Sequence, residues 1–173
     1  MKSKTQRTFS GKAGYHKFDM ARGQIETAIR LFVTDGADMF SAIALAANAG
    51  DLFHALVVRA GKKPFIDDIV LLEGKHNPGK TPPRYRMITH VHEVLFVNEL
   101  KHLDDAREEG DEIVEFDAEE AAIGAILKAI ADYQALTGER SPAMNAFLGW
   151  CYQNLDSDAI MKEFEGAGRA DAV

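Results

Sequence analysis

Cysteine and long apolar runs are nearly absent from this chain, and each shortage excludes a class of protein. A single cysteine, Cys151, among 173 residues excludes an internal disulfide framework and fits a reducing compartment. No apolar run reaches the roughly 20 residues of a membrane-spanning helix. The longest, residues 39–49, is soon followed by Asp51 and His54. The first residues also lack the apolar block of a secretory signal. We therefore expect a cytoplasmic protein that does not contact a membrane.

Motifs for the common cofactors and nucleophiles are missing as well. The sequence holds no Gly-x-Gly-x-x-Gly fingerprint, no phosphate-binding loop with lysine and no Gly-x-Ser-x-Gly elbow. Cys151 has no Cys-x-x-Cys partner and lies on the apolar face of an expected helix, which favours an inert core thiol over a nucleophile. We expect no cofactor.

Charge is spread unevenly along the chain. The formal net charge is -7, yet residues 1–17 carry five basic side chains and no acid. An acidic stretch at residues 104–120 holds ten carboxylates and one base, whereas a basic stretch at residues 75–86 holds Lys75, Lys80, Arg84 and Arg86. An acidic body disfavours general binding to nucleic acid. The basic arm and the basic loop remain the places where RNA or a protein partner is expected to bind.

Hydrophobic periodicity predicts helices throughout. Apolar residues recur at helical spacing near residues 18–33, 39–60, 64–72 and 84–103, and three further helices are expected after Asp117, Ser141 and Asp156. Their starts carry capping signals, among them Asp38 and the Ser141-Pro142 pair. The pattern predicts an all-α bundle of six to seven helices in one domain, residues 18–166. Residues 1–17 are expected to form a flexible basic arm, and residues 167–173 a flexible tail.

One polar segment is the best candidate for a site. Asn98 and His102 are four residues apart, so on a continuous helix their side chains would meet, with Lys101 and Asp104 beside them. Histidine titrates near neutral pH, and an amide can orient its ring or a substrate oxygen. The alternative is structural: Lys101 and His102 also suit the negative end of a helix dipole.

The histidines are also candidates for a metal site. His92, Glu99 and His102 fall within a narrow arc of the expected fourth helix, and His54 of the second helix could join them. The His-Glu-x-x-His motif is missing, however. We therefore expect no bound metal and keep a metal-dependent enzyme only as an alternative.

Several segments together resemble a family of uncharacterised bacterial helical proteins. The resemblance rests on residues 21–32 (ARGQIETAIRLF) with Asp35-Gly36, on residues 98–104 (NELKHLD), on residues 114–117 (VEFD) and on residues 133–139 (YQALTGE) with Ser141-Pro142. It covers roughly residues 18–155 and brings no established activity with it.

More remotely, a helical bundle with a polar residue four positions before a late histidine resembles the HEPN superfamily. That resemblance implies an up-and-down helical core, a homodimer and, in many members, metal-independent cleavage of RNA by an Arg…His pair. Apolar residues stand where the arginine would precede His102. Arg86 and His92 have the required spacing, but Met87 follows where the family has a polar residue.

Three functions remain open at this point. The first is a HEPN-like scaffold without catalysis that binds a partner or ligand through Asn98, Lys101 and His102. The second is a HEPN-type ribonuclease that uses His102 or His92 as acid or base, with Lys101 or Arg86 on the phosphate. The third is the metal-dependent enzyme.

Overall fold

The chain is all-α, as predicted. The computed structural model describes residues 12–35, 38–79, 81–100 and 113–159, and no strand occurs among them. The elements, in chain order, are α1 (Lys17–Arg30), η1 (Leu31–Asp35), α2 (Met39–Arg59), α3 (Phe65–His76), α4 (Arg84–Val94), α5 (Ala118–Thr137) and α6 (Pro142–Asn154). The short η1 is a π-helical turn that continues α1.

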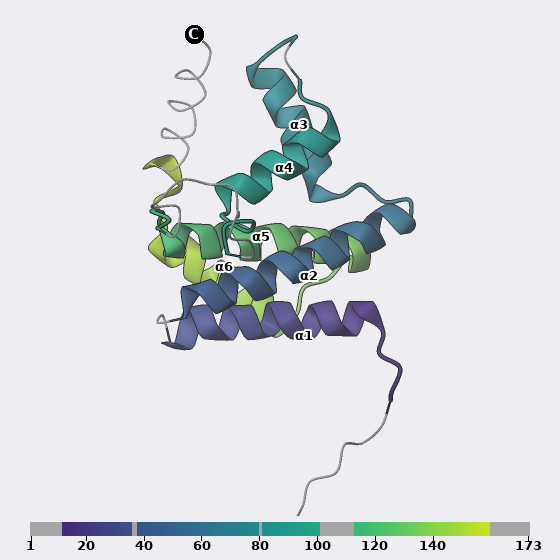
Figure 1. The fold of residues 1–173 in the computed structure, drawn as a ribbon, viewed down its shortest axis with the longest axis vertical. Helices are drawn as coiled ribbons and strands as arrows, with labels where there is room; N and C mark the ends of the chain where they lie inside the picture. Colours follow the sequence, from purple (N-terminus) through teal and green to yellow (C-terminus); the bar gives the residue numbers. More distant parts are fainter. Residues whose placement is uncertain (1–11, 36–37, 80, 101–112, 160–173) are drawn as a thin grey trace, which may run out of the picture.

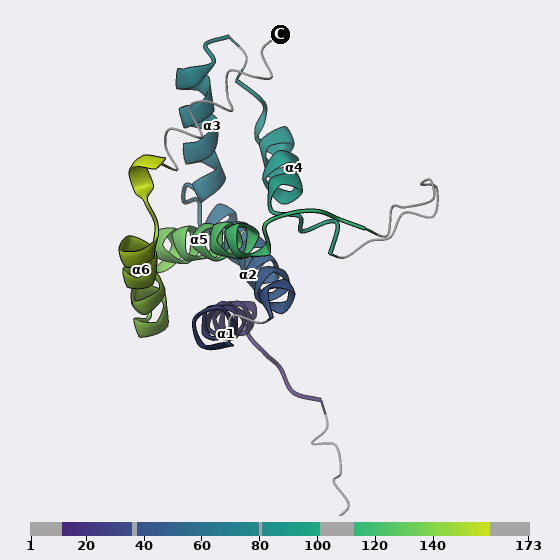
Figure 2. The ribbon, with the colours of Figure 1, turned by 90° about the vertical axis from the view of Figure 1, so that its left-hand side faces the viewer.

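The core is formed by α1, α2 and α5, which lie side by side, with α6 against their edge (Figures 1 and 2). Small residues line the contact faces, so that the helices approach closely: Ala42, Ala46, Ala47, Ala49 and Gly50 on α2, and Ala121, Ala122, Ala125 and Ala129 on α5 are all buried. Large side chains then fill the layers between them. Both α2 and α5 are buried on most sides, which makes them the central pair.

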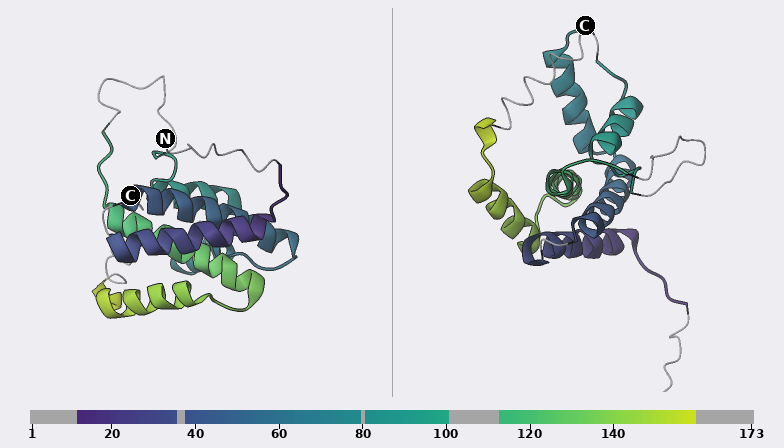
Figure 3. Two further views of the ribbon diagram at one scale, coloured as in Figure 1. Left: turned by 90° about the horizontal axis from the view of Figure 1, so that it is seen from below. Right: turned by 60° about the vertical axis from the view of Figure 1, so that its left-hand side comes forward.

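The α3–α4 hairpin stands apart from this core. It projects from the three-helix layer, as Figures 1 and 2 and the right-hand view of Figure 3 show. Ile66 and Met87 are the hydrophobic side chains that α3 and α4 bury, whereas Leu71, Leu72, Tyr85 and Val94 are exposed. Few apolar contacts therefore hold the hairpin, and its polar contacts with the core matter more.

Most capping predictions are confirmed. Asp38 accepts a hydrogen bond from Ser41 N–H at 3.0 Å, and Asp117 accepts from Glu119 and Glu120 at the start of α5. Ser141 caps α6 with Pro142 in its first turn. Asp156 accepts from the N–H groups of residues 158 and 159, whereas the rest of the last expected helix lies outside the described residues. Pro64, expected as the first residue of α3, is instead its N-cap.

The fourth helix is shorter than predicted, because it ends at Val94 rather than near residue 103. Phe96 takes a left-handed conformation (φ 53°), and Val97 N–H bonds to His92 O while Phe96 N–H bonds to Glu93 O. These two hydrogen bonds form a Schellman motif, which normally uses glycine at the left-handed position. The Phe96 ring stacks on Phe116 at 4.4 Å, and this contact helps to offset the backbone strain.

By length and composition alone, α2 is apolar enough to cross a membrane. Buried helices in the cores of globular domains pass the same test. Eight of its residues are buried in the structure, and α2 packs between α1 and α5. Its apolar character is accounted for by the core.

Candidate functional site

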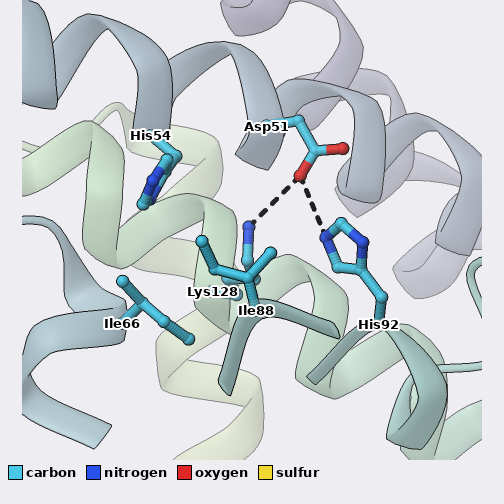
Figure 4. A pocket seen from close by; sticks show the side chains of 6 residues that line it. All are labelled: Asp51, His54, Ile66, Ile88, His92 and Lys128. Carbon is cyan, nitrogen blue, oxygen red and sulfur yellow. Dashed lines mark hydrogen bonds and ion pairs between the residues drawn. The ribbon is translucent and has the colours of Figure 1, made fainter. Parts of the chain in front are cut away.

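A pocket of about 220 Å³ lies where the α3–α4 hairpin meets the core. It is lined by Asp51 and His54 of α2, Ile66 of α3, Ile88 and His92 of α4, and Lys128 of α5 (Figure 4). Asp51 and His54 are three residues apart, and Ile88 and His92 are four apart, so each pair occupies one face of its helix. Four helices thus contribute to one small cavity.

Lys128 is the buried cation of this pocket. Its side chain is 9% exposed, and its Nζ lies 3.6 Å from Asp51 Oδ1, which is an ion pair beyond ordinary hydrogen-bond length. Gly50 gives the ammonium room, since a Cβ added there would lie 3.1 Å from Nζ. The absence of a side chain at position 50 therefore helps to place the charge beside Asp51.

Asp51 also orients His92. Nε2 of His92 lies 3.2 Å from the same Oδ1 that faces Lys128, and the His92 side chain is 20% exposed. One carboxylate oxygen therefore links α4 to α5 (Figure 4). A carboxylate on one ring nitrogen fixes the orientation of the imidazole, as acid–base catalysis and specific binding both require.

Asp132, one turn beyond Lys128, fastens the start of α3. Its Oδ1 accepts a hydrogen bond from Phe65 N–H at 2.8 Å, although Asp132 is only 1% exposed. Its Oδ2 is buried and has no hydrogen-bond partner among the described residues. Burial raises the pKa of Asp132, and the Phe65 N–H and the Lys128 charge only partly oppose this.

Burial also acts on His54. It lowers the pKa of this histidine, an effect that the Asp132 charge opposes and the Lys128 charge reinforces. His54 therefore favours its neutral form, with one N–H donor and one acceptor nitrogen. The pocket thus combines an ammonium, a neutral imidazole and a carboxylate-bound imidazole.

Only part of the candidate segment at residues 98–104 is among the described residues. Asn98 is exposed in a turn beyond the end of α4, whereas Lys101, His102 and Asp104 lie outside the described residues. The helix that was expected to place Asn98 and His102 on one face ends before either residue.

The two residues of the Arg86…His92 pair lie in different environments. His92 faces the pocket, whereas Arg86 is exposed and its Nε donates to Tyr85 Oη at 3.3 Å. Of the expected basic loop, Lys75 is exposed, and Arg84 pairs with Asp67 at 2.5 Å. The basic arm is exposed from residue 12 onward, and its earlier part lies outside the described residues.

Two of the candidate metal ligands, His54 and His92, line the same pocket. Glu99 is not among the lining residues, and His102 lies outside the described part of the chain. Within that part, no three histidine, cysteine or acidic side chains are placed to hold an ion together. Cys151 is half-buried, and burial raises the pKa of its thiol, in agreement with an inert role.

Sequence reasoning missed Asp51, Lys128 and Asp132. A signal was present, because Lys128 and Asp132 are four residues apart in a helix that is otherwise rich in alanine and isoleucine. From the sequence alone, a charged pair at this spacing indicates the solvent-exposed face of an amphipathic helix. Only the placement of α3 and α4 over α5 buries it.

Comparisons with known proteins yield no relative. No family model matches the chain, and no curated protein or solved structure is significantly similar to it. Function must therefore be inferred from the pocket.

Proposed function

We propose that this chain is a HEPN-like, cytoplasmic helical protein that acts by binding a small ligand in the pocket between the α3–α4 hairpin and the core. The observation that carries this proposal is the set of Lys128, His54 and the Asp51–His92 pair around one cavity. Buried charged groups are costly for stability alone, so their convergence on a cavity favours a binding role.

The exposed apolar residues of the hairpin support a partner as well. Leu71, Leu72, Tyr85 and Val94 all lie on α3 or α4. Apolar surface of this kind is commonly covered when two copies pair around a two-fold axis. The expected homodimer is therefore proposed to form through the hairpin.

Ligand binding is tested by amide NMR spectra of the full chain during titration with four small probes: valerate, valeramide, butylamine and inorganic phosphate. At least one probe is expected to shift the amides of Asp51, His54, Ile88 and Lys128. Ile88→Phe should remove these shifts, because the larger ring fills the cavity. If no probe moves the pocket amides, the proposal is wrong.

Val58→Phe is the matched control. Val58 lies on α2, the helix that carries Asp51 and His54, but is 44% exposed and does not line the pocket. The added ring should therefore leave the shifts intact. Circular dichroism of both variants confirms that each is folded.

Metal-independent cleavage of RNA is a second candidate, favoured by two histidines and a lysine in one pocket. In such a reaction the 2′-oxygen attacks phosphorus while a base removes its proton. The P–O5′ bond breaks as an acid protonates the leaving oxygen, which gives a 2′,3′-cyclic phosphate and a free 5′-hydroxyl. Neutral His54 is suited to the base and His92 to the acid, with Lys128 on the phosphate charge.

This candidate predicts cleavage of labelled single-stranded RNA in the presence of EDTA. His54→Ala and His92→Ala should each reduce the rate by about 100-fold or more, the usual contribution of an acid or base. His90→Ala on the exposed side of α4 should not change it. Cleavage that survives both pocket substitutions but is lost in His102→Ala would assign the chemistry to His102 instead.

A further inference from the structure

The α3–α4 hairpin takes little part in the apolar core. Ile66 and Met87, the hydrophobic side chains that it buries, lie outside the cluster of buried residues that α1, α2, α5 and α6 share. The hairpin and the turn before it are fastened to the core by polar contacts instead. These are Lys62 Nζ with Leu136 O, Phe65 N–H with Asp132 Oδ1, and His92 Nε2 with Asp51 Oδ1.

Both ends of the hairpin pass into tight turns. Before α3, Gly61 takes a left-handed conformation (φ 65°), and a Cβ added there would meet nothing within 4 Å. After α4, Phe96 is left-handed as well (φ 53°), and the chain rejoins the apolar core at Leu95 and Val97. Hinges between rigid elements are short segments of this kind, in which a few residues absorb the change in backbone angles.

The closed position leaves one buried polar atom unsatisfied. Asp132 Oδ2 has no hydrogen-bond partner among the described residues, although the other oxygen of this carboxylate accepts from Phe65 N–H at the start of α3. An unsatisfied buried acceptor costs free energy, and water would hydrate it once α3 moved away. The Oδ2 atom therefore favours opening of the hairpin, whereas the hydrogen bond to Oδ1 favours closure.

Opening of the hairpin would divide the pocket into two halves. The core contributes Asp51, His54 and Lys128 to its lining, and the hairpin contributes Ile66, Ile88 and His92 (Figure 4). The two helices of the hairpin are held to each other by the ion pair between Arg84 and Asp67. They can therefore move together, and the cavity exists only while they lie against the core.

We infer that the α3–α4 hairpin is a hinged lid, which rotates as one unit about residues 60–64 and 95–97 and closes over the ligand of the pocket. The role of the lid rests on the proposed ligand-binding function. The motion itself rests on the few contacts that fasten the hairpin and on the two turns that flank it.

Thiol labelling of the full chain measures the opening. Ile66→Cys, combined with Cys151→Ser, places the one thiol under α3, and Ile43→Cys makes the same change at a fully buried position of α2. Each rate is divided by that of the same variant unfolded in urea. Labelling at position 66 should then be at least about tenfold faster than at position 43, because segments held by few contacts open at lower free energy.

The urea dependence gives a second reading of the same experiment. Labelling at position 66 should depend less steeply on urea than labelling at position 43, since a hinge motion exposes less surface than unfolding does. Equal rates with equal urea dependence would mean that α3 leaves the core only in global unfolding, and they would overturn the lid.

Amide hydrogen exchange in the wild-type chain tests whether the helices stay folded, and it needs no cysteine variant. Phe65 N–H bonds across to Asp132, so a hinge motion exposes it, whereas amides in the middle of α3 keep their bonds within the helix. The Phe65 amide should exchange at least about tenfold faster than those amides. Equal exchange would show that α3 unfolds rather than rotates, which would also overturn the lid.

Addition of the probes separates the lid from the binding function. A probe that shifts the pocket amides should slow exchange at Phe65 when it saturates the chain, because a bound ligand stabilises the closed form. A bound probe that leaves this exchange unchanged would overturn the lid and leave ligand binding standing. If no probe binds, the binding proposal is wrong, and the labelling rates alone decide the hinge motion.

Discussion

Replacing Phe53 by alanine is expected to lower the free energy of unfolding by about 3–5 kcal/mol, the range for deleting a buried aromatic ring. Phe53 is fully buried on α2. Its ring packs edge-on against Tyr133 at 5.3 Å and Phe18 at 5.9 Å, so it joins α1, α2 and α5. The alanine leaves a cavity that three helices border, and backbone relaxation on one helix cannot close it.

Urea denaturation followed by circular dichroism measures this loss, with Phe40→Ala as the control on the same helix. Phe40 is 57% exposed, and its ring lies 6.1 Å from Phe116, so its removal should cost about 1 kcal/mol or less. Equal losses for the two variants would contradict the assignment of α2 as the central helix.

The second large effect concerns Asp132. Asp132→Ala is expected to be less stable than Asp132→Asn by about 1–3 kcal/mol, because only the amide can still accept the hydrogen bond from Phe65 N–H. Neither variant titrates at this position, so the difference should persist from pH 4 to pH 8. A difference near zero would mean that the capping bond to α3 does not contribute.

The wild-type chain should differ from Asp132→Asn in a pH-dependent way. Burial raises the pKa of Asp132 in the folded state above the ordinary aspartate value of about 3.9. The unfolded chain then releases the proton more readily, so this residue costs stability as pH rises from about 4 through the folded-state pKa. Asp132→Asn should therefore match wild type near pH 4 and be the more stable protein at pH 7.

Chemical denaturation of both chains at each pH measures this difference. The matched comparison cancels the titration of the other carboxylates. A wild-type chain that gains stability over Asp132→Asn as pH rises would reverse the inferred direction of the pKa shift.

The helices themselves were predictable because their determinants are local. Three of the helix starts depend on a cap side chain that accepts a hydrogen bond from a backbone N–H no more than three positions further along the chain. The caps are Asp38, Asp117 and Ser141. The end of α4 was not predictable, because it depends on a left-handed phenylalanine. That conformation is stabilised by a ring stack on Phe116, twenty positions further along the chain.

The site was less predictable than the fold. The sequence predicts His54 only as a candidate metal ligand, and His92 either as a metal ligand or as the acid or base of a ribonuclease, and it does not reveal their neighbours in the fold. Asp51 and Lys128 are 77 positions apart, and no spacing rule links residues on separate helices. Their contact follows from the packing of α2 on α5, which Gly50 and the alanine faces permit.

The pairing of α2 with α5 also governs the order in which this chain can fold during synthesis. Helix α2 is complete at residue 59, but α5 begins only at residue 118. A ribosome making about 5–20 residues per second therefore leaves the apolar face of α2 uncovered for several seconds. During that interval the face of α2 that will pack on α5 is exposed to water, although the helix is apolar enough by composition to cross a membrane.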